Sequence, residues 1–319
     1  TAGLTGQVTV GQTLTLNSGS ETGMLAVTGD LAMAPNSSID WNGDGDMVTV
    51  SGALDLTSDW SVLMNPPGVV QPGTYDLFTY GSMAGAMIDP SLVPPAANPY
   101  ADLVDIGASS VIDNSIDSKI QLVIVGTAAA IWDGTAGNDW ITAGNWVDSI
   151  APSATIAAVI DDSTASVPTL TGAADAHTLI IDAASATIGA GGDLAVANNT
   201  HVMDGSTLTI ASGGLLQSRG NTTVYLGGDL DLAGTLTLND DKNLNLGGDA
   251  TISGTVNLAA IDATAGNLNV TGGEATLTSS AVINTNAVNA TGGVLNLEAD
   301  LGATGTLLSV NGGTVNTTG

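Results

Sequence analysis

Seven Gly-Gly pairs punctuate the chain from Gly191 onward, and this repetition constrains the fold more than any other feature. Short segments between them alternate Leu, Val or Ile with Thr, Asn or Asp, as in residues 207–210 and 243–246. Period-two alternation is typical of β-strands, and a repeat of about 20 residues is typical of stacked coils. The pairs begin at Gly191, Gly213, Gly227, Gly247, Gly272, Gly292 and Gly312, at gaps of 22, 14, 20, 25, 20 and 20 residues. The pattern predicts a β-solenoid, and the gaps of 14 and 25 predict coils of unequal length.

The composition indicates how such a solenoid is filled. Aromatic residues make up 3% of the 319 residues, with a single Phe, whereas Gly occurs 42 times. A core built on rings is therefore excluded, and Leu, Val, Ile and Ala must fill a narrow channel, as they do in β-helices. No amphipathic helix is evident. We expect an all-β chain that forms a right-handed parallel β-helix with a non-solenoid junction.

The charge is strongly one-sided. There are 31 acidic residues against three basic ones, Lys119, Arg219 and Lys242, which gives a formal net charge of −28. Nucleic-acid binding needs a basic footprint, and docking on an anionic bilayer needs basic clusters, so both are disfavoured. Enzymes that act on acidic polysaccharides also need Arg or Lys. The acidic surface instead favours solubility and attracts divalent cations.

Cysteine and membrane signals are missing from the sequence. Without Cys there is no disulfide, thiolate metal site or thiol nucleophile. The longest mostly apolar stretch, residues 122–132, is too short to span a membrane. The start is already strand-like, so we expect any leader to have been removed. A Cys-free chain rich in Gly, Thr, Asn and Asp indicates an extracellular or cell-surface location in a bacterium.

The chain divides into four predicted segments. Residues 1–66 are strand-rich coils. Residues 67–126 form a junction, because seven of the ten prolines lie between Pro66 and Pro99 and proline cannot donate to a strand ladder. Within this junction, an aromatic strand at 73–80 is expected to pair with a strand at 119–125 or to flank the first stack. Residues 127–165 contain three tryptophans in a local plug, and residues 166–319 are coils of about 20 residues. Both ends stop in mid-pattern without a polar cap, so we expect either a fragment of a longer protein or a subunit that stacks end to end.

Two sets of motifs resemble bacterial autotransporter-associated β-strand repeat proteins. Trp132-Asp-Gly, Asn138-Asp-Trp140 and Ala-Gly-Asn-Trp146 resemble the start of a unit in that family. Residues 46–56, 73–80 and 116–125 resemble the end of one. The resemblance covers most of the chain and implies a secreted, passenger-type β-helix of the cell surface, here spanning a junction between two units of a tandem array.

The strongest candidate for chemistry is an acidic loop. Asp40, Asn42, Asp44 and Asp46 alternate with other residues in the pattern of the first half of an EF-hand-like calcium loop. The twelfth position is Ser51 where a Glu is expected, and no helices flank the loop. The alternatives are a calcium site and a polar β-turn between coils.

Two further acidic motifs are predicted to be structural. Residues 134–141 resemble one nonapeptide of the calcium-binding β-roll but have no tandem copy, so a tight turn is favoured. Acidic residues follow four Gly-Gly pairs, and in register they would stack at about 4.8 Å per coil. Because the gaps are unequal, we expect solvated corners rather than a ladder. These residues are Asp193, Asp229, Asp249 and Glu274.

The remaining candidates also favour structural roles. His177 and His201 lack the spacing of a catalytic triad or a metal pair and are expected at strand edges. The pairs Asp161-Asp162 and Asp240-Asp241 are expected in turns. Six Asn-X-Ser/Thr sequons are interpreted as products of stacked Asn and Thr ladders; they begin at Asn36, Asn198, Asn221, Asn269, Asn289 and Asn316.

The function predicted from these features is structural and not enzymatic. We expect an extracellular surface protein, namely an adhesin, a fibre or a surface-layer component, that contacts surface glycans or other cell-surface partners and self-associates end to end. One alternative is a polysaccharide-active β-helix enzyme, which would need convergent acids with Lys or Arg on one face. Another is a rod that is stabilised by calcium.

Overall fold

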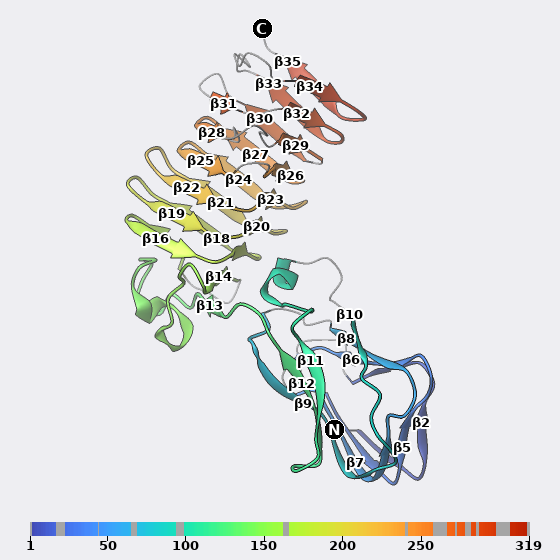
Figure 1. The fold of residues 1–319 in the computed structure, drawn as a ribbon. Helices are drawn as coiled ribbons and strands as arrows, with labels where there is room; N and C mark the ends of the chain where they lie inside the picture. Colours follow the sequence, from blue (N-terminus) through green and yellow to red (C-terminus); the bar gives the residue numbers. More distant parts are fainter. Residues whose placement is uncertain are drawn as a thin grey trace. The chain divides into compact units, whose positions relative to one another are not determined.

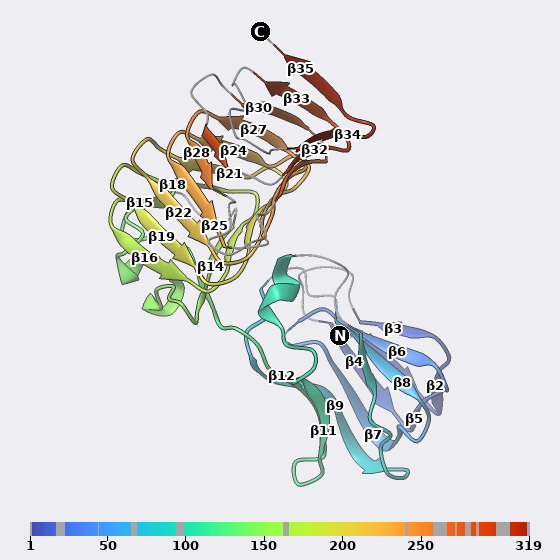
Figure 2. The same cartoon turned by 45° about the horizontal axis from the view of Figure 1, so that its top comes forward.

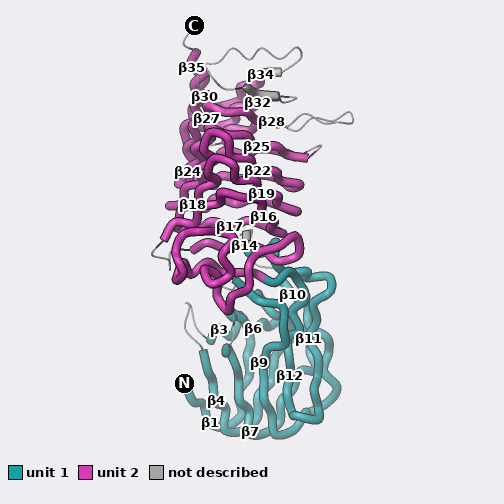
Figure 3. The backbone as a smooth tube through the Cα atoms, turned by 90° about the vertical axis from the view of Figure 1, so that its left-hand side faces the viewer, with its two compact units in different colours: residues 1–128 teal, residues 129–319 magenta. Residues whose placement is uncertain are grey.

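The structure is a computed structural model that describes residues 2–16, 23–43, 45–64, 69–93, 99–161, 166–239, 242–257, 267–271, 273–277, 282–284, 287–297 and 307–317. It divides into two compact units, residues 1–128 and 129–319 (Figure 3). Each unit is described by itself. The finer division into four segments stays a prediction. Among the described residues, no helix combines the length and apolar character that crossing a membrane requires.

Unit 1 contains two sheets. The larger sheet consists of β1 (Ala2–Thr5), β4 (Met24–Thr28), β7 (Met47–Asp55), β9 (Gly73–Met83), β12 (Lys119–Ile124) and β11 (Ser110–Asn114) in spatial order, with β2 (Val8–Val10) and β5 (Leu31–Met33) joined beside β7. The smaller sheet consists of β10 (Ser91–Val93), β8 (Trp60–Met64), β6 (Ser37–Trp41) and β3 (Thr13–Thr15). A 3-10 helix, η1 (Pro99–Leu103), precedes β11. Successive coils place their strands in both sheets, so unit 1 is itself a parallel solenoid.

The Pro-rich segment does not break this stack, which corrects one expectation. β9 runs parallel to β7, and β10 runs parallel to β8, so residues 73–93 add a further coil. The described prolines avoid the ladders: Pro72 and Pro90 each precede a strand, and Pro99 begins η1. Proline is tolerated at those positions because no ladder hydrogen bond is lost there.

Parallel stacking in unit 1 ends instead at an antiparallel hairpin. β12 pairs antiparallel with both β9 and β11, which confirms the expected pairing of the aromatic strand. At this edge Lys119 Nζ donates to Asp76 at 2.6 Å, and Gln121 Nε2 donates at 2.7 Å. Burial alone would raise the pKa of Asp76, but these two hydrogen bonds outweigh it and hold the pKa below its ordinary value.

Unit 2 is a three-sheet parallel β-helix (Figures 1 and 2). Sheet 1 consists of β13 (Ala129–Ile131), β14 (Ala157–Ile160), β17 (Leu179–Ile181), β20 (Thr200–Val202), β23 (Thr222–Val224), β26 (Leu244–Leu246), β29 (Asn267–Val270), β32 (Ala287–Ala290) and β34 (Leu307–Val310). Sheet 2 consists of β15 (Thr169–Leu170), β18 (Ser185–Ile188), β21 (Thr207–Ile210), β24 (Asp229–Leu232), β27 (Asp249–Ile252), β30 (Glu274–Leu277), β33 (Val294–Leu297) and β35 (Thr314–Thr317). Sheet 3 consists of β16 (Ala173–Ala176), β19 (Asp193–Val196), β22 (Leu215–Ser218), β25 (Thr235–Leu238), β28 (Thr255–Asn257) and β31 (Val282–Asn284). The predicted parallel β-helix is therefore present.

The coils are more regular than the Gly-Gly gaps suggest. Thr200 pairs with Thr222 and Thr222 with Leu244, each 22 residues later, whereas Leu268 pairs with Val288 20 residues later. The gap of 14 is not a short coil. The pairs at 191 and 213 lie between sheets 2 and 3, but those from 227 onward lie between sheets 1 and 2. Only the gap of 25 reflects a long coil, which contains residues 258–266.

The two glycines of a pair have different tasks, as Gly227 and Gly228 illustrate. Gly227 has a φ of 83°, which other residues adopt only with strain. A Cβ on Gly228 would lie 2.6 Å from the Met203 carbonyl oxygen of the preceding coil. The first glycine therefore allows the turn and the second allows close stacking.

The core of unit 2 is aliphatic along the coils and aromatic at its start. Inward Leu, Val, Ile and Ala residues of successive coils form one buried cluster. At the start, Trp132, Trp140 and Trp146 are all buried, and the ring of Trp146 meets the other two edge-on with centroids 5.0 Å apart. Trp146 Nε1 also donates to the Trp140 carbonyl at 2.8 Å. Two short 3-10 helices, η2 (Ala143–Asn145) and η3 (Val147–Ser149), form the turns of this plug.

Candidate functional site

The predicted calcium loop connects β6 to β7, and Asp46 is its buried member at 3% exposure. Asp46 Oδ1 accepts from the Gly23 amide at 2.7 Å, and Oδ2 accepts from the Asn42 amide at 3.0 Å. The carboxylate therefore ties its own loop to the preceding coil. Asp40 and Asn42 lie in the same turn, and Asp44 lies outside the described residues. Within the described ranges, no three His, Asp or Glu side chains are grouped so that they could hold a metal ion. The calcium site stays a prediction.

The second predicted loop is a hydrogen-bonded turn. Asp139 Oδ2 accepts from the Thr142 hydroxyl at 2.9 Å, and the Asn145 amide donates to the Asp139 carbonyl at 2.9 Å. Asp133 Oδ1 accepts from both the amide and the hydroxyl of Thr135 at 2.9 Å. These contacts position the tryptophan plug, in agreement with the structural interpretation.

Three of the four acids after Gly-Gly pairs form a column, contrary to expectation. Asp229 and Asp249 are opposite each other in sheet 2, and the Glu274 amide donates to Asp249 Oδ1 at 2.7 Å. Asp193 lies apart, in sheet 3. Burial, with Asp249 and Asp231 close by, raises the pKa of Asp229. The column arises because these three acids follow pairs at the same corner.

Amide ladders account for several of the sequon asparagines. On the outward face of sheet 1, Asn269 donates to Asn245 at 2.8 Å, and Asn289 donates to Asn269 at 2.9 Å. Asn245 in turn donates to the Thr223 hydroxyl at 3.4 Å. Asn316 donates to Asn296 at 2.8 Å in sheet 2. The predicted Asn and Thr ladders are therefore present at these positions.

A second ladder runs along the corner before sheet 1. The side-chain oxygen of Asn199 accepts from the backbone amide of Asn221 at 2.8 Å, Asn221 accepts from Asn243 at 2.8 Å, and Asn243 accepts from Asn267 at 2.9 Å. Each asparagine thus caps the strand entry of the following coil. The outward face of sheet 1 is held in register by both ladders.

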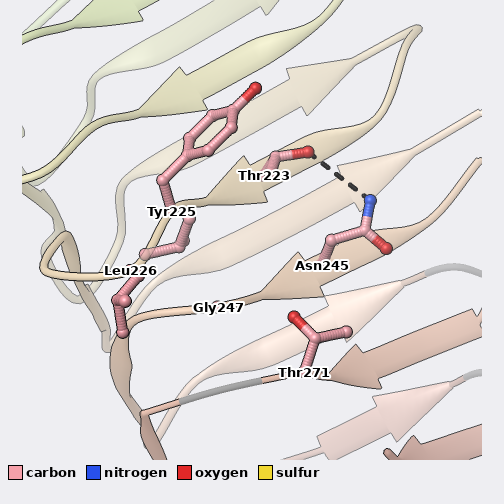
Figure 4. Close-up of a pocket in the computed structure, with 7 residues that line it drawn as sticks. Thr223, Tyr225, Leu226, Asn245, Gly247 and Thr271 are labelled. Atoms are coloured by element: carbon pink, nitrogen blue, oxygen red, sulfur yellow. Dashed lines mark hydrogen bonds between the residues drawn. The ribbon is translucent and has the colours of Figure 1, made fainter. Parts of the chain in front are cut away.

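A pocket of about 290 Å³ borders the amide row of sheet 1 (Figure 4). Tyr225, Gly247 and Thr271 each follow a sheet 1 strand, and they stack because Gly247 and Thr271 donate their amides to the coil before, at 2.7 and 2.8 Å. Gly247 has no side chain, which leaves the hollow. Leu226, 74% exposed, forms one wall. Thr223 and Asn245 form the wall next to the ladder.

His201 orients the aromatic wall of this pocket. Its Nδ1 lies 3.1 Å from the Tyr225 hydroxyl, and the two rings lie 5.9 Å apart at 31°. Tyr225 is thereby directed toward the preceding coil, and the space over Gly247 stays open (Figure 4). His201 is buried within β20, whereas His177 Nδ1 lies 3.1 Å from the Thr178 hydroxyl. Neither histidine lies in a catalytic triad or a pair of metal ligands among the described residues.

The sequence interpretation missed this pocket, although a signal was present. Tyr225 is the only Phe, Trp or Tyr after Trp146. It directly precedes an exposed leucine and a Gly-Gly pair, one coil before a second glycine pair. A lone aromatic residue in an aliphatic repeat indicates an outward role, because the narrow core has no room for a ring.

Comparisons with known proteins add little to this geometry. No protein-family model matches the chain, and no curated protein matches it. Among solved structures, the crystal structure of a TibC-catalyzed, hyper-glycosylated TibA fragment is similar to this chain. The likeness has 16% sequence identity and a TM-score of 0.22 and covers 98% of this chain and 97% of the fragment. Values this low carry no argument about function, so the family resemblance stays a prediction.

Proposed function

We propose that this chain is a structural surface protein of a bacterium, of the adhesin or fibre type, and that it contacts its partner through the outward face of sheet 1. The observation that carries the proposal is the amide ladder Thr223–Asn245–Asn269–Asn289 beside the pocket over Gly247. A row of side chains held in register is already ordered before binding, so little entropy is lost on contact.

The chemistry of this face fits a protein partner on another surface. The pocket walls include Val224, Tyr225 and the exposed Leu226, which suit an apolar anchor residue of the partner. The amides next to them both donate and accept, so they suit the partner's polar groups around that anchor. The resemblance to passenger-type repeat proteins supports the same location and role.

The alternatives require features that the sheet 1 face does not supply. A polysaccharide-active enzyme would need paired carboxylates on either side of a bound sugar, whereas this face presents amides and hydroxyls. A rod that is stabilised by calcium depends on the loop at Asp40–Asp46 and is tested separately below.

Location and binding are tested together in the cells that make the protein. Antibodies against unit 2 should label intact cells as strongly as permeabilised ones. The purified full chain should be retained on partner-bearing surfaces, and Leu226→Asp should abolish that retention. Labelling only after permeabilisation would contradict the proposed location, and retention unaffected by Leu226→Asp would contradict the proposed face.

A further inference from the structure

A second hollow lies on the outward face of sheet 3, away from the sheet 1 pocket. Its volume is about 140 Å³, and it adjoins one of about 170 Å³ that shares Asp175, Ala195 and Gln217. Asp175, Ala195, Gln217 and Thr237 form one outward column across four coils. Ala195 is the smallest side chain of that column, so the hollow is open above it.

The neighbouring column deepens the hollow. Ala197, Arg219 and Asn239 each follow a sheet 3 strand, and their backbone amides donate to the coil before at 2.9, 2.9 and 3.0 Å. Alanine again stands on the coil where the other column has Ala195. The floor is therefore apolar, and Arg219 and Asn239 stand on the coils that follow.

The rim has groups of several hydrogen-bonding types. Asp175 only accepts, Arg219 only donates, and Gln217, Thr237 and Asn239 do both. Gln217 is already positioned, because its Nε2 donates to Asp193 Oδ1 at 2.8 Å. Among the described residues the one ion pair joins Lys119 and Asp76, so no direct ion pair there neutralises Arg219.

The ligand that fits has an apolar face for the alanines and an edge of groups that both donate and accept. A pyranose ring with its hydroxyls has this pattern. An anionic ligand would meet Asp175 and the −28 charge of the chain, and a cation would meet Arg219. We infer that the sheet 3 hollow over Ala195 and Ala197 binds one neutral sugar residue of a glycan, with Asp175 and Arg219 bonding to its hydroxyls from opposite sides.

The test is ligand-observed saturation-transfer NMR on the full chain with methyl hexopyranosides. Glucuronate and glycine serve as the anionic and zwitterionic probes. We expect at least one hexopyranoside to bind with a dissociation constant of about a millimolar, as is usual for so small a ligand. Ala195→Leu fills the hollow and should weaken binding roughly tenfold or more. Asp175→Ala and Arg219→Gln should do the same.

Thr209→Leu is the matched control, because it places the same side chain on the outward face of sheet 2. It should leave binding unchanged, and circular dichroism should show every variant to be folded. Absence of binding by any hexopyranoside would overturn the inference. So would binding that Ala195→Leu does not weaken, or a preference for glucuronate or glycine. Leu226→Asp, which tests the sheet 1 face, should not affect this site, so the two proposals fail separately.

Discussion

The side-chain amide of Asn269 donates to the side-chain oxygen of Asn245, 2.8 Å away on the preceding coil. Asn269 also accepts from Asn289, so it is the central member of the ladder. Ladder members of this kind stabilise a solenoid locally, because each coil contacts only its neighbours. The outward face of sheet 1 therefore depends on an unbroken row of amides.

Asn269→Ala removes two of these hydrogen bonds and should lower stability by about 1–2 kcal/mol. Asn269→Asp should be at least as harmful, since its carboxylate cannot donate to Asn245. Hydrogen exchange of sheet 1 amides measures the effect coil by coil. Thr251→Ala, on the outward face of sheet 2, is the control. Equal protection in Asn269→Ala and wild type would show that the ladder does not stabilise the face.

Asp229→Asn should stabilise the protein at neutral pH. The pKa of Asp229 is raised above its ordinary value of 3.8 by burial and by Asp249 and Asp231. A raised pKa of an acid means that stability is greatest below the unfolded pKa and is lost as pH rises through the folded pKa. The residue is exposed, so the gain should be about 0.5 kcal/mol or less.

The measurement for Asp229→Asn is a pair of denaturation curves at pH 7 and at a pH below 3.8. The gain should be present at pH 7 and absent at the acidic pH. Asp193→Asn, in sheet 3, is the comparison. A variant that is less stable at pH 7 would mean that a cation or a partner group already neutralises this column.

Asp46→Ala should loosen the loop between β6 and β7. The variant leaves the Gly23 and Asn42 amides without their carboxylate acceptor, at a cost of about 2–3 kcal/mol because buried donors lose their partner. Hydrogen exchange of those two amides should rise sharply. Asp59→Ala, at an exposed position of the same unit, should change neither. Slow exchange in Asp46→Ala would mean that the carboxylate is not what holds the loop.

The calcium prediction is tested on the same pair of proteins. If Asp40, Asn42, Asp44 and Asp46 bind calcium, the wild-type melting temperature should fall when EDTA replaces calcium, and that of Asp46→Ala should not respond. An equal melting temperature of the wild type in both buffers would reject the site and leave the hydrogen-bonded turn.

Trp146→Ala should strongly destabilise the start of unit 2. Trp146 is buried between two other indoles and donates to the Trp140 carbonyl, so truncation should cost about 3–5 kcal/mol. Trp146→Phe keeps a ring and should cost less. Ile150→Ala, at an exposed position of the same segment, should have little effect. Thermal unfolding followed by circular dichroism gives the order, and an innocuous Trp146→Ala would show that the plug does not close the core.

The sequence predicted the architecture well because the repeat itself carries it. Alternating Leu and Thr in residues 207–210 correctly placed a strand with one buried face. The coil lengths could not be predicted, because Gly213 and Gly227 look alike in sequence yet occupy different corners. The same ambiguity concealed the column of Asp229 and Asp249, which requires knowledge of the corner at which each acid lies.

The binding faces were less predictable than the fold. The sheet 1 pocket depends on Gly247 stacking between Tyr225 and Thr271, three residues from three coils. The sheet 3 hollow similarly depends on Ala195 and Ala197 following Asp175 and preceding Arg219. Such sites depend on register between coils, and register follows from coil lengths that the sequence leaves ambiguous.

The most direct test of the central claim is retention of coated beads on partner-bearing surfaces. Beads carrying the full wild-type chain should resist washing, and beads carrying Leu226→Asp should detach, because a charge would enter the wall of the sheet 1 pocket. Beads carrying Thr209→Asp, with the same charge on sheet 2, should behave as wild type. Equal retention of all three proteins, or of none, would contradict a binding role for the outward face of sheet 1.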